Sequence, residues 1–409
     1  MTGTAFAAIL LLLLGTYLDV PVAVILAIVV LMVEMVSQIW TRFGLDGVTY
    51  RRRLERDRIG WGEEIQMTVE VWNRKRLPLA WLRADDATTL GVVVRERVLV
   101  IGRTGAGVLR NAWTLAPFER VARQFHVGAE RRGVYELGPV DLAVGDLFAR
   151  EAARRELQDI ARFLVRPRIV PTEAVHRRDM IGGADRARFG LTEDPSRFAG
   201  IREYAPGDPL RRIHARASAR LGRPVVKRFE PSRDRELLLA LDVQVAAGPA
   251  RDTATDDEEV EGLFVVAASL ARSLALERAA FGLAAAGYHG AESRFAFLPL
   301  SEAPDQAERV FDLLARLSAY PSAPFELLLA KVARAVRPGT TIVAVTARDP
   351  SPYLVHLQRL NRIGCPVVVL ACGRDGVANA GRARQAGLAA RSVRLDAPWR
   401  VATTLAVTG

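Results

Sequence analysis

Cysteine is scarce in this chain, which carries Cys365 and Cys372 alone among its 409 residues. The two lie at the ends of an apolar run. In a strand that rises about 3.3 Å per residue, their sulfurs lie about 20 Å apart on opposite faces. That separation excludes a disulfide bond between them. The sequence therefore excludes a small disulfide-stapled scaffold and favours a reduced, cytosolic environment.

Lysine and aromatic residues are also scarce, although the chain is strongly basic. The formal net charge is +11, aromatic residues make up 7%, and the 57 basic residues are Arg except for Lys75, Lys227 and Lys331. Abundant Arg and Ala are typical of a GC-rich genome. The aromatic residues do not alternate with the basic runs as a stacking platform for single strands requires. We therefore expect no nucleic-acid partner.

Motifs for nucleotide chemistry, zinc binding and nucleophilic catalysis are missing as well. The glycine-rich run at 101–107 lacks a Gly-Lys-Ser/Thr ending and favours a hairpin turn, and no Walker A sequence occurs. The five histidines have no zinc spacing, and no Ser-His-Asp arrangement can be argued. We expect a non-enzymatic protein with no cofactor and no small-molecule substrate, so any ATP chemistry must come from a partner.

Two apolar runs are present near the N-terminus, at residues 4–18 and 20–40. The second carries Glu34 as its one charge and is long enough to cross a hydrocarbon core of about 30 Å, whereas the first is marginal. A cleavable signal peptide is the alternative, but no basic segment precedes the first run. The Arg-rich stretch at 42–58 places the N-terminus and the long C-terminal part in the cytoplasm. The sequence predicts a multi-pass cell-membrane protein with two transmembrane helices within residues 1–41.

Residues 42–165 and 236–409 have the patterns of two different folded domains. Between 42 and 165, short runs such as 65–72 and 121–127 alternate with period two and predict a small antiparallel β-sandwich. Between 236 and 409, apolar runs alternate with helical segments and predict a mainly parallel sheet covered on both faces. The expected strands are 236–242, 279–286, 295–300, 340–346 and 366–371, and the expected helices are 260–277, 304–317 and 352–363.

The connecting segment, residues 166–235, contains the densest motif of the chain. Pro206-Gly207 marks a turn, Asp208 is a candidate N-cap, and Gly222 is a candidate C-cap, so the sequence predicts a helix over 209–221. Three basic residues recur on this helix at a spacing of four and form one stripe: Arg212, Arg216 and Arg220. The stripe is either a solvated face or a docking surface for an acidic partner.

This segment resembles the R-E-Y, P-G-D, R-x-I, S-A-R and V-K-x-F-E series of the domain-of-unknown-function 58 family, with Ala215 where the family usually has Trp. The resemblance implies a membrane-anchored bacterial or archaeal scaffold with a von Willebrand factor A-like (Rossmann-type) domain. It also implies a MoxR-type AAA+ ATPase as partner in protein or complex maturation. We expect the signature or partner-docking residues to be Arg202, Glu203, Tyr204, Pro206, Gly207, Asp208, Arg212, Arg216, Ser218, Arg220, Lys227 and Glu230.

The alternative function is a divalent-metal-dependent binding protein or hydrolase. A von Willebrand factor A-like domain binds its cation through a D-x-S-x-S loop, because a hard ion requires oxygen donors. The corresponding residues here are Asp242, Gln244 and Ala246, so the carboxylate is present and both hydroxyls are missing. Such a degenerate site would take Mg²⁺ through Asp242. The opposing interpretation is that Asp242 caps a turn or pairs with a nearby Arg. The acidic residues within 248–261 are a second candidate docking surface.

Overall fold

The computed structural model describes residues 3–102, 105, 107–145, 151–173, 193–205, 208, 212–231, 236–245, 257–287 and 294–408. The chain divides into two compact units, Met1–Arg166 and Pro167–Gly409. The predicted Pro206, Gly207 and Ala246 lie outside the described residues, as does most of the acidic stretch at 248–261.

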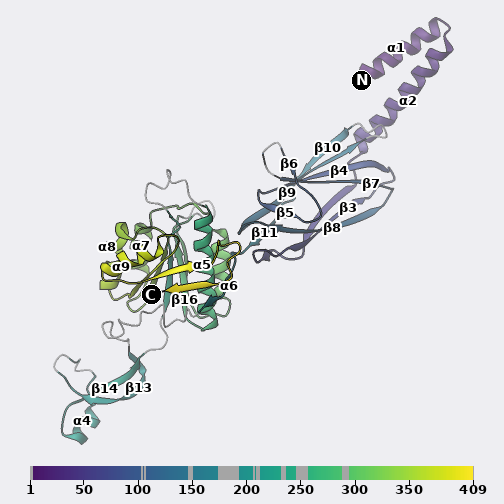
Figure 1. Cartoon of the computed structure of the whole chain (residues 1–409). Coiled ribbons are helices and arrows are strands. Elements are labelled where there is room, and N and C mark those ends of the chain that lie inside the picture. Colours follow the sequence, from purple (N-terminus) through teal and green to yellow (C-terminus); the bar gives the residue numbers. More distant parts are fainter. Residues whose placement is uncertain are drawn as a thin grey trace. The chain divides into compact units, whose positions relative to one another are not determined.

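The first unit begins with two antiparallel helices, α1 (Gly3–Tyr17) and α2 (Pro21–Phe43) (Figure 1). The connection turns at Asp19, whose φ is 53°, and Pro21 starts the second helix, where the missing N–H leaves no partner unsatisfied. Among the described residues, Pro21–Trp40 is the one segment long and apolar enough, at 20 residues, to be a candidate membrane span. The shorter α1 has 15 residues, so α2 alone of the two is a candidate membrane helix by length and composition.

Two β-sheets follow in the same unit, and apart from the parallel pair of β2 and β11 they confirm the predicted antiparallel architecture. Strand β3 alternates buried and half-buried residues, and its inner side chains join a core between the sheets that includes Ile65, Met67 and Phe125. The first sheet has the order β1 (Val48–Leu54), β3 (Ile65–Asn73), β8 (Arg120–Ala129) and β5 (Val92–Val94). The second has the order β2 (Arg58–Ile59), β11 (Ala161–Val165), β9 (Gly133–Gly145), β4 (Leu79–Thr88), β7 (Gly107–Leu115) and β6 (Val100–Ile101), with β10 (Glu151–Leu157) beside β9.

The second unit contains a mixed, mainly parallel sheet with helices on both faces. Helices α5 (Asp257–Leu276) and α6 (Gln306–Arg316) contribute to the core on one face, and the others contribute to the core on the opposite face. The sheet order is β12 (Thr172–Glu173), β21 (Leu405–Thr408), β20 (Ala389–Leu395), β19 (Val367–Ala371), β18 (Thr341–Thr346), β15 (Leu237–Leu241), β16 (Phe281–Ala285) and β17 (Ala296–Ser301). The opposite-face helices are α7 (Phe325–Ala335), α8 (Leu354–Arg362) and α9 (Gly376–Gln385).

The predicted strands and helices of this unit are all found, within a few residues of the expected bounds. Cys372 lies in the core beneath α5, and Cys365 lies in the core on the other face, so the predicted separation of the two thiols is confirmed. The sequence patterns did not identify α7, α9, β20 and β21. Strand β17 runs antiparallel to β16 and completes one edge of the sheet.

Candidate functional site

Asp242 lies at the carboxyl end of β15, the edge at which ligands bind in sheets of this kind. Its side chain is buried and accepts hydrogen bonds from Thr346 Oγ1 at 3.0 Å, Arg348 Nε at 2.7 Å and the Gln244 backbone N–H at 3.2 Å. Arg348 also donates to Glu326 Oε1 at 3.1 Å. The carboxylate therefore sits opposite a guanidinium that is itself held between two acidic groups.

Neighbouring strands bring these residues together from distant parts of the sequence. Strands β15 and β18 run parallel with Leu241 opposite Val345, so Asp242 and Thr346 leave adjacent strand ends. The Tyr353 hydroxyl donates to Thr346 Oγ1 at 2.9 Å, and its ring lies 4.8 Å from the Arg348 guanidinium carbon. The cluster is thus a polar network inside the fold, fixed by two strands and the turn after β18.

The charges of this network decide what the site can bind. Burial raises the pKa of Asp242 to about 6, although the Arg348 guanidinium and the hydrogen bonds oppose that rise. At neutral pH the carboxylate is ionised, and Arg348 supplies the positive charge that a divalent cation would supply. Gln244 contributes its backbone N–H, and among the described residues no group of three Asp, Glu, His or Cys side chains could hold a metal. The described geometry supports the interpretation that Asp242 pairs with an Arg.

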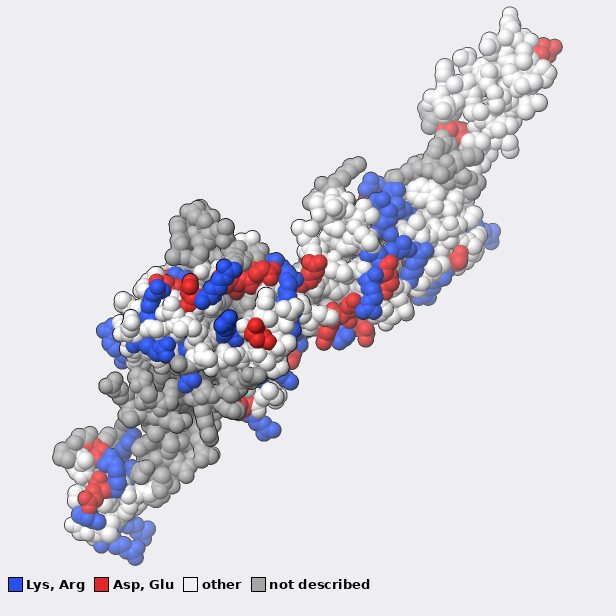
Figure 2. Space-filling view, in the orientation of Figure 1, with Lys and Arg blue, Asp and Glu red and all other residues white. Residues whose placement is uncertain are grey.

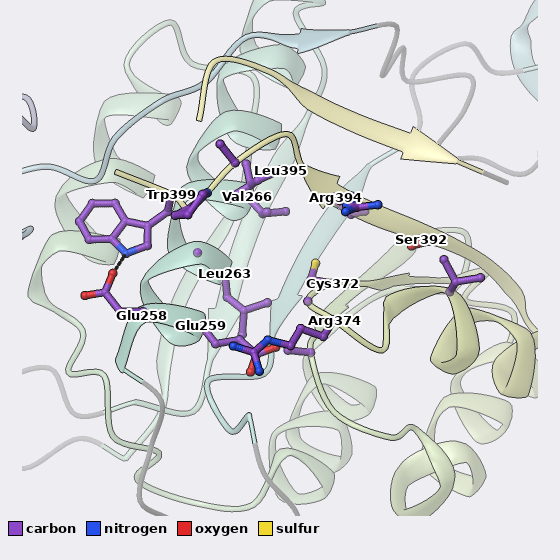
Figure 3. Close-up of a pocket in the computed structure, with 17 residues that line it drawn as sticks. Glu258, Glu259, Leu263, Val266, Cys372, Arg374, Ser392, Arg394, Leu395 and Trp399 are labelled. Carbon is purple, nitrogen blue, oxygen red and sulfur yellow. Dashed lines mark hydrogen bonds between the residues drawn. The ribbon is translucent and has the colours of Figure 1, made fainter. Parts of the chain in front are cut away.

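A cavity of about 670 Å³ lies over the carboxyl ends of β19 and β20 (Figure 3). Leu263 and Val266 from α5 form part of its apolar wall, and Arg374 and Arg394 add positive charge. The indole N–H of Trp399 donates to Glu258 Oε2 at 2.6 Å. The volume is typical of sites for small molecules or short peptide segments. The cavity also contains acidic groups, so it presents both signs of charge beside an apolar wall.

The groups at this cavity favour binding over nucleophilic chemistry. Cys372 lines it, but burial raises the pKa of that thiol to about 12, so the sulfur stays protonated at neutral pH. Glu258, a member of the predicted acidic docking surface, accepts from Trp399 and from Arg400 Nη2 at 3.1 Å. At least this carboxylate is engaged within the fold. The run at 389–395, followed by Pro398-Trp399, was the sequence signal that could have predicted the side of the cavity formed by β20 and Trp399.

The signature residues form a separate cluster on the two-stranded hairpin of β13 (Glu193–Glu203) and β14 (Val225–Pro231). Arg202 binds Asp208 through two hydrogen bonds of 2.7 and 2.6 Å, and Asp208 Oδ2 also accepts from the Ala205 N–H at 2.9 Å. Hydrogen bonds from Arg202 and Ala205 lower the pKa of Asp208 to about 2. The same contacts close the turn that follows β13.

Other signature residues also stabilise the hairpin from within. Glu203 forms an ion pair with Arg223, and the Tyr204 N–H donates to the Pro224 carbonyl at 3.0 Å. The Val225 N–H donates to Ser218 Oγ at 3.0 Å, which ties the helix between the two strands to β14. Arg202, Glu203, Tyr204, Asp208 and Ser218 are therefore brought together in one hairpin. Of Glu230 only the backbone, in β14, is described.

Within the described part of the predicted helix at 209–221, which excludes residues 209–211, the α-helix α4 spans Ala215–Leu221. Ile213 forms a β-bridge with Val226, and the His214 N–H donates to the Val225 carbonyl at 2.8 Å. The backbone of these two residues therefore pairs with β14 and is not part of the helix. The N-cap of α4 is His214, whose Nδ1 accepts from the Ala217 N–H at 3.2 Å, so the predicted N-cap Asp208 does not cap this helix. Gly222 does end the helix, with φ of 66°. The stripe is thus reduced to Arg216 and Arg220, with Arg212 outside the α-helix.

An apolar helical hairpin, an antiparallel β-sandwich and a mixed α/β unit with a charged β-hairpin define a multidomain class of protein with a candidate membrane helix near the N-terminus. The family model described as "Protein of unknown function DUF58" matches residues 200–326. Residues 200–326 of this chain are therefore similar to the DUF58 family.

Comparison with other proteins gives one curated relative and several weak structural similarities. The chain is 25% identical over 242 residues to the uncharacterized protein YeaD of Bacillus subtilis (strain 168), an alignment that covers 58% of this chain and 55% of that protein. The chain thus spans about half the length of this relative. Among solved structures, the CARDB domain of PF1109 from Pyrococcus furiosus is 16% identical and covers 29% of this chain and 84% of that one, with a TM-score of 0.20. Spo0M from Bacillus subtilis is 15% identical and covers 29% and 49%, with a TM-score of 0.17.

Proposed function

We propose that this chain is a membrane-anchored cytosolic adaptor whose β13–β14 hairpin docks an acidic surface of a MoxR-type AAA+ ATPase during protein or complex maturation. One observation carries the proposal: the charged signature residues Arg202, Asp208 and Glu203 are used in ion pairs that build the hairpin. Other basic side chains of this segment are exposed, namely Arg216 and Arg220 on α4 and Lys227 on β14. A surface with this excess of positive charge attracts an acidic partner over a range of about 10 Å and accelerates its docking.

A second proposal concerns the α/β unit. We infer that it is a von Willebrand factor A-like module in which Arg348 takes the place of the divalent cation. The 2.7 Å contact between Arg348 and Asp242 supports this inference, since it places a fixed positive charge at the carboxyl edge of the sheet. The sequence has no Walker A motif, so ATP hydrolysis belongs to the partner in this scheme.

Reversing the charge of two Arg side chains beside the hairpin tests the proposed binding of the ATPase. We expect the detergent-solubilised full chain to recover an AAA+ ATPase from its host in the presence of ATP and Mg²⁺. Recovery by the Arg216→Glu/Arg220→Glu variant should fall on the order of 10-fold, because repulsion replaces attraction at the docking surface. The measurement is quantitative mass spectrometry of the bound fraction.

The matched control is Arg334→Glu/Arg384→Glu, which makes the same charge change at exposed positions of α7 and α9. Recovery by this control should equal that of the unmodified chain. Equal recovery by the hairpin variant, or reproducible absence of any AAA+ ATPase from the unmodified chain, would contradict the proposed partnership.

We also propose that α1 and α2 both cross the membrane, with the N-terminus and the long C-terminal part in the cytoplasm. The antiparallel pairing of the helices, the Thr4 Oγ1 to Glu34 Oε2 hydrogen bond of 3.2 Å and the basic residues after α2 support this topology. In intact cells, a membrane-impermeant maleimide should label the Asp19→Cys variant and leave the Arg384→Cys variant unlabelled until lysis. Both native thiols are buried, which keeps the background low. Labelling of Arg384→Cys in intact cells would reverse the topology.

A further inference from the structure

The end of the sandwich that adjoins α2 is built from three segments joined by hydrogen bonds: the turn at 44–47, the loop at 74–78 and the turn at 116–119. Lys75 Nζ donates to the Phe43 carbonyl at 2.6 Å and also to that of Gly44, so its ammonium caps the end of α2. The Arg74 N–H donates to the Gly47 carbonyl at 2.8 Å, and the Phe118 N–H donates to the Lys75 carbonyl at 3.3 Å. We call these three segments, with Arg42, Phe43, Trp72 and Arg120 beside them, the sandwich tip.

Aromatic rings and guanidinium groups are paired at the sandwich tip. The Arg42 guanidinium carbon lies 5.6 Å from the Phe43 ring centroid, and that of Arg74 lies 4.5 Å from the Trp72 ring. Arg120 approaches the same Trp72 ring at 5.8 Å. Phe118 is 60% exposed and Phe43 is 48% exposed, so two large apolar rings face outward beside these cations.

The backbone and the charges both distinguish this end of the molecule. Phe118 has φ of 61°, a left-handed conformation that is unfavourable for a bulky residue and that places its exposed ring in a tight turn. Figure 2 shows basic side chains gathered on the sandwich toward the end at which α2 leaves it. The acidic residues of the tip are Asp46 and Glu119, and the basic residues are Arg42, Arg74, Lys75, Arg76 and Arg120.

We propose that the sandwich tip docks onto the headgroups of anionic phospholipids, in addition to the anchoring of the chain by α2. This inference rests on the proposed membrane anchorage. The candidate span ends at Trp40, and Phe43 lies about 5 Å further along the helix axis, which places the tip at headgroup level. Phe and Trp side chains of interfacial segments lie at the boundary between headgroups and acyl chains, and Arg and Lys favour an anionic leaflet.

Docking of the tip would also fix the orientation of the sandwich at the membrane surface. The helix end is bonded to the tip through Lys75. Arg155 Nη1 of strand β10 donates to the Leu45 carbonyl at 3.4 Å and so bonds the tip to the sandwich. Because α2 and the tip are bonded, contact of the tip with lipid holds the sandwich in one orientation at the membrane surface. Guanidinium groups suit this role because they bind phosphate oxygens through two parallel hydrogen bonds.

The test places a polarity-sensitive fluorophore on the Phe118→Cys variant of the full chain, reconstituted in nanodiscs of phosphatidylcholine with or without phosphatidylglycerol. Lipids that carry a nitroxide on the headgroup quench the fluorescence when the labelled residue contacts the headgroups. We expect strong quenching with phosphatidylglycerol and weak quenching without it or at high salt. The Arg74→Glu/Arg76→Glu change should reduce the ratio of docked to undocked protein by about 25-fold, since each basic residue contributes about 5-fold.

Two controls separate the possible results. Arg53→Glu/Arg56→Glu makes the same charge change at the other end of β1 and should leave the quenching intact, and a fluorophore on Glu55→Cys should not be quenched. Failure of the chain to enter nanodiscs would contradict the proposed anchorage. Incorporation with equal quenching in both lipids, or with no response to Arg74→Glu/Arg76→Glu, would overturn the docking inference alone.

Discussion

The Arg348→Met variant is expected to lower the free energy of unfolding of the α/β unit by about 3–5 kcal/mol, because it leaves a buried carboxylate without its counter-charge. The side chains of Arg348 and Asp242 are 7% and 2% exposed, so water cannot replace the lost partner. Glu326 also loses its 3.1 Å contact with the guanidinium. Native-state hydrogen exchange of the full chain measures the effect at the amides of β15 and β18, independently of the sandwich.

The matched control is Arg382→Met, which removes an Arg from an exposed pair with Asp349 at 3.3 Å. An exposed ion pair contributes at most about 1 kcal/mol, so this variant should be nearly neutral. Equal losses in the two variants would show that the buried pair is not the cause.

The pH dependence of the same variant gives an independent check on the cause. In the native protein the pKa of Asp242 is about 6, above its ordinary value of 3.8, so the folded state binds more protons than the unfolded state between these values. This group therefore favours folding at low pH and loses that contribution as the pH rises toward 6. Without Arg348 the pKa rises further, and the destabilisation should be large at neutral pH and small below pH of about 4. A loss that does not change with pH would indicate lost packing instead of an unpaired charge.

The Asp86→Ala variant is expected to cause a loss of similar size in the sandwich, about 3–5 kcal/mol, because Arg52 then becomes a buried unpaired cation. The Arg52 side chain is 0% exposed, and its Nη1 lies 2.5 Å from Asp86 Oδ1. The Tyr50 hydroxyl, which donates to Asp86 Oδ2, also loses its acceptor. The opening free energy of β1 and β4 amides, again by hydrogen exchange, measures the loss.

The neighbouring residue provides the control for this change. Asp85 lies on the same strand and pairs with Arg110 at 2.8 Å, but the Arg110 side chain is 50% exposed, so Asp85→Ala should cost at most about 1 kcal/mol. Adding Arg52→Met to Asp86→Ala should restore much of the stability, since it removes the unpaired charge. No restoration by Arg52→Met would show that the loss comes from the cavity at Asp86.

The sequence by itself determined the features that depend only on residues close together in the chain, namely the strands and the faces to which their side chains point. Period-two alternation at 65–72 gave a strand of the sandwich, and unbroken apolar runs such as 340–346 gave strands buried on both faces. Seven-residue spacing placed Cys365 and Cys372 on opposite faces. These features are local, because a strand or helix repeats its side-chain direction with a fixed period.

Only the tertiary structure decided the features that join distant residues. Arg348 pairs with Asp242 across 106 positions, because parallel strands bring their carboxyl ends to one edge of the sheet, and no period in the sequence encodes that contact. Similarly, α4 begins at Ala215 because strand pairing with β14 takes the backbone before it, although turn and cap residues predicted an earlier start. Backbone groups satisfied by a distant strand are unavailable to a local helix, and that competition is settled only when the chain folds.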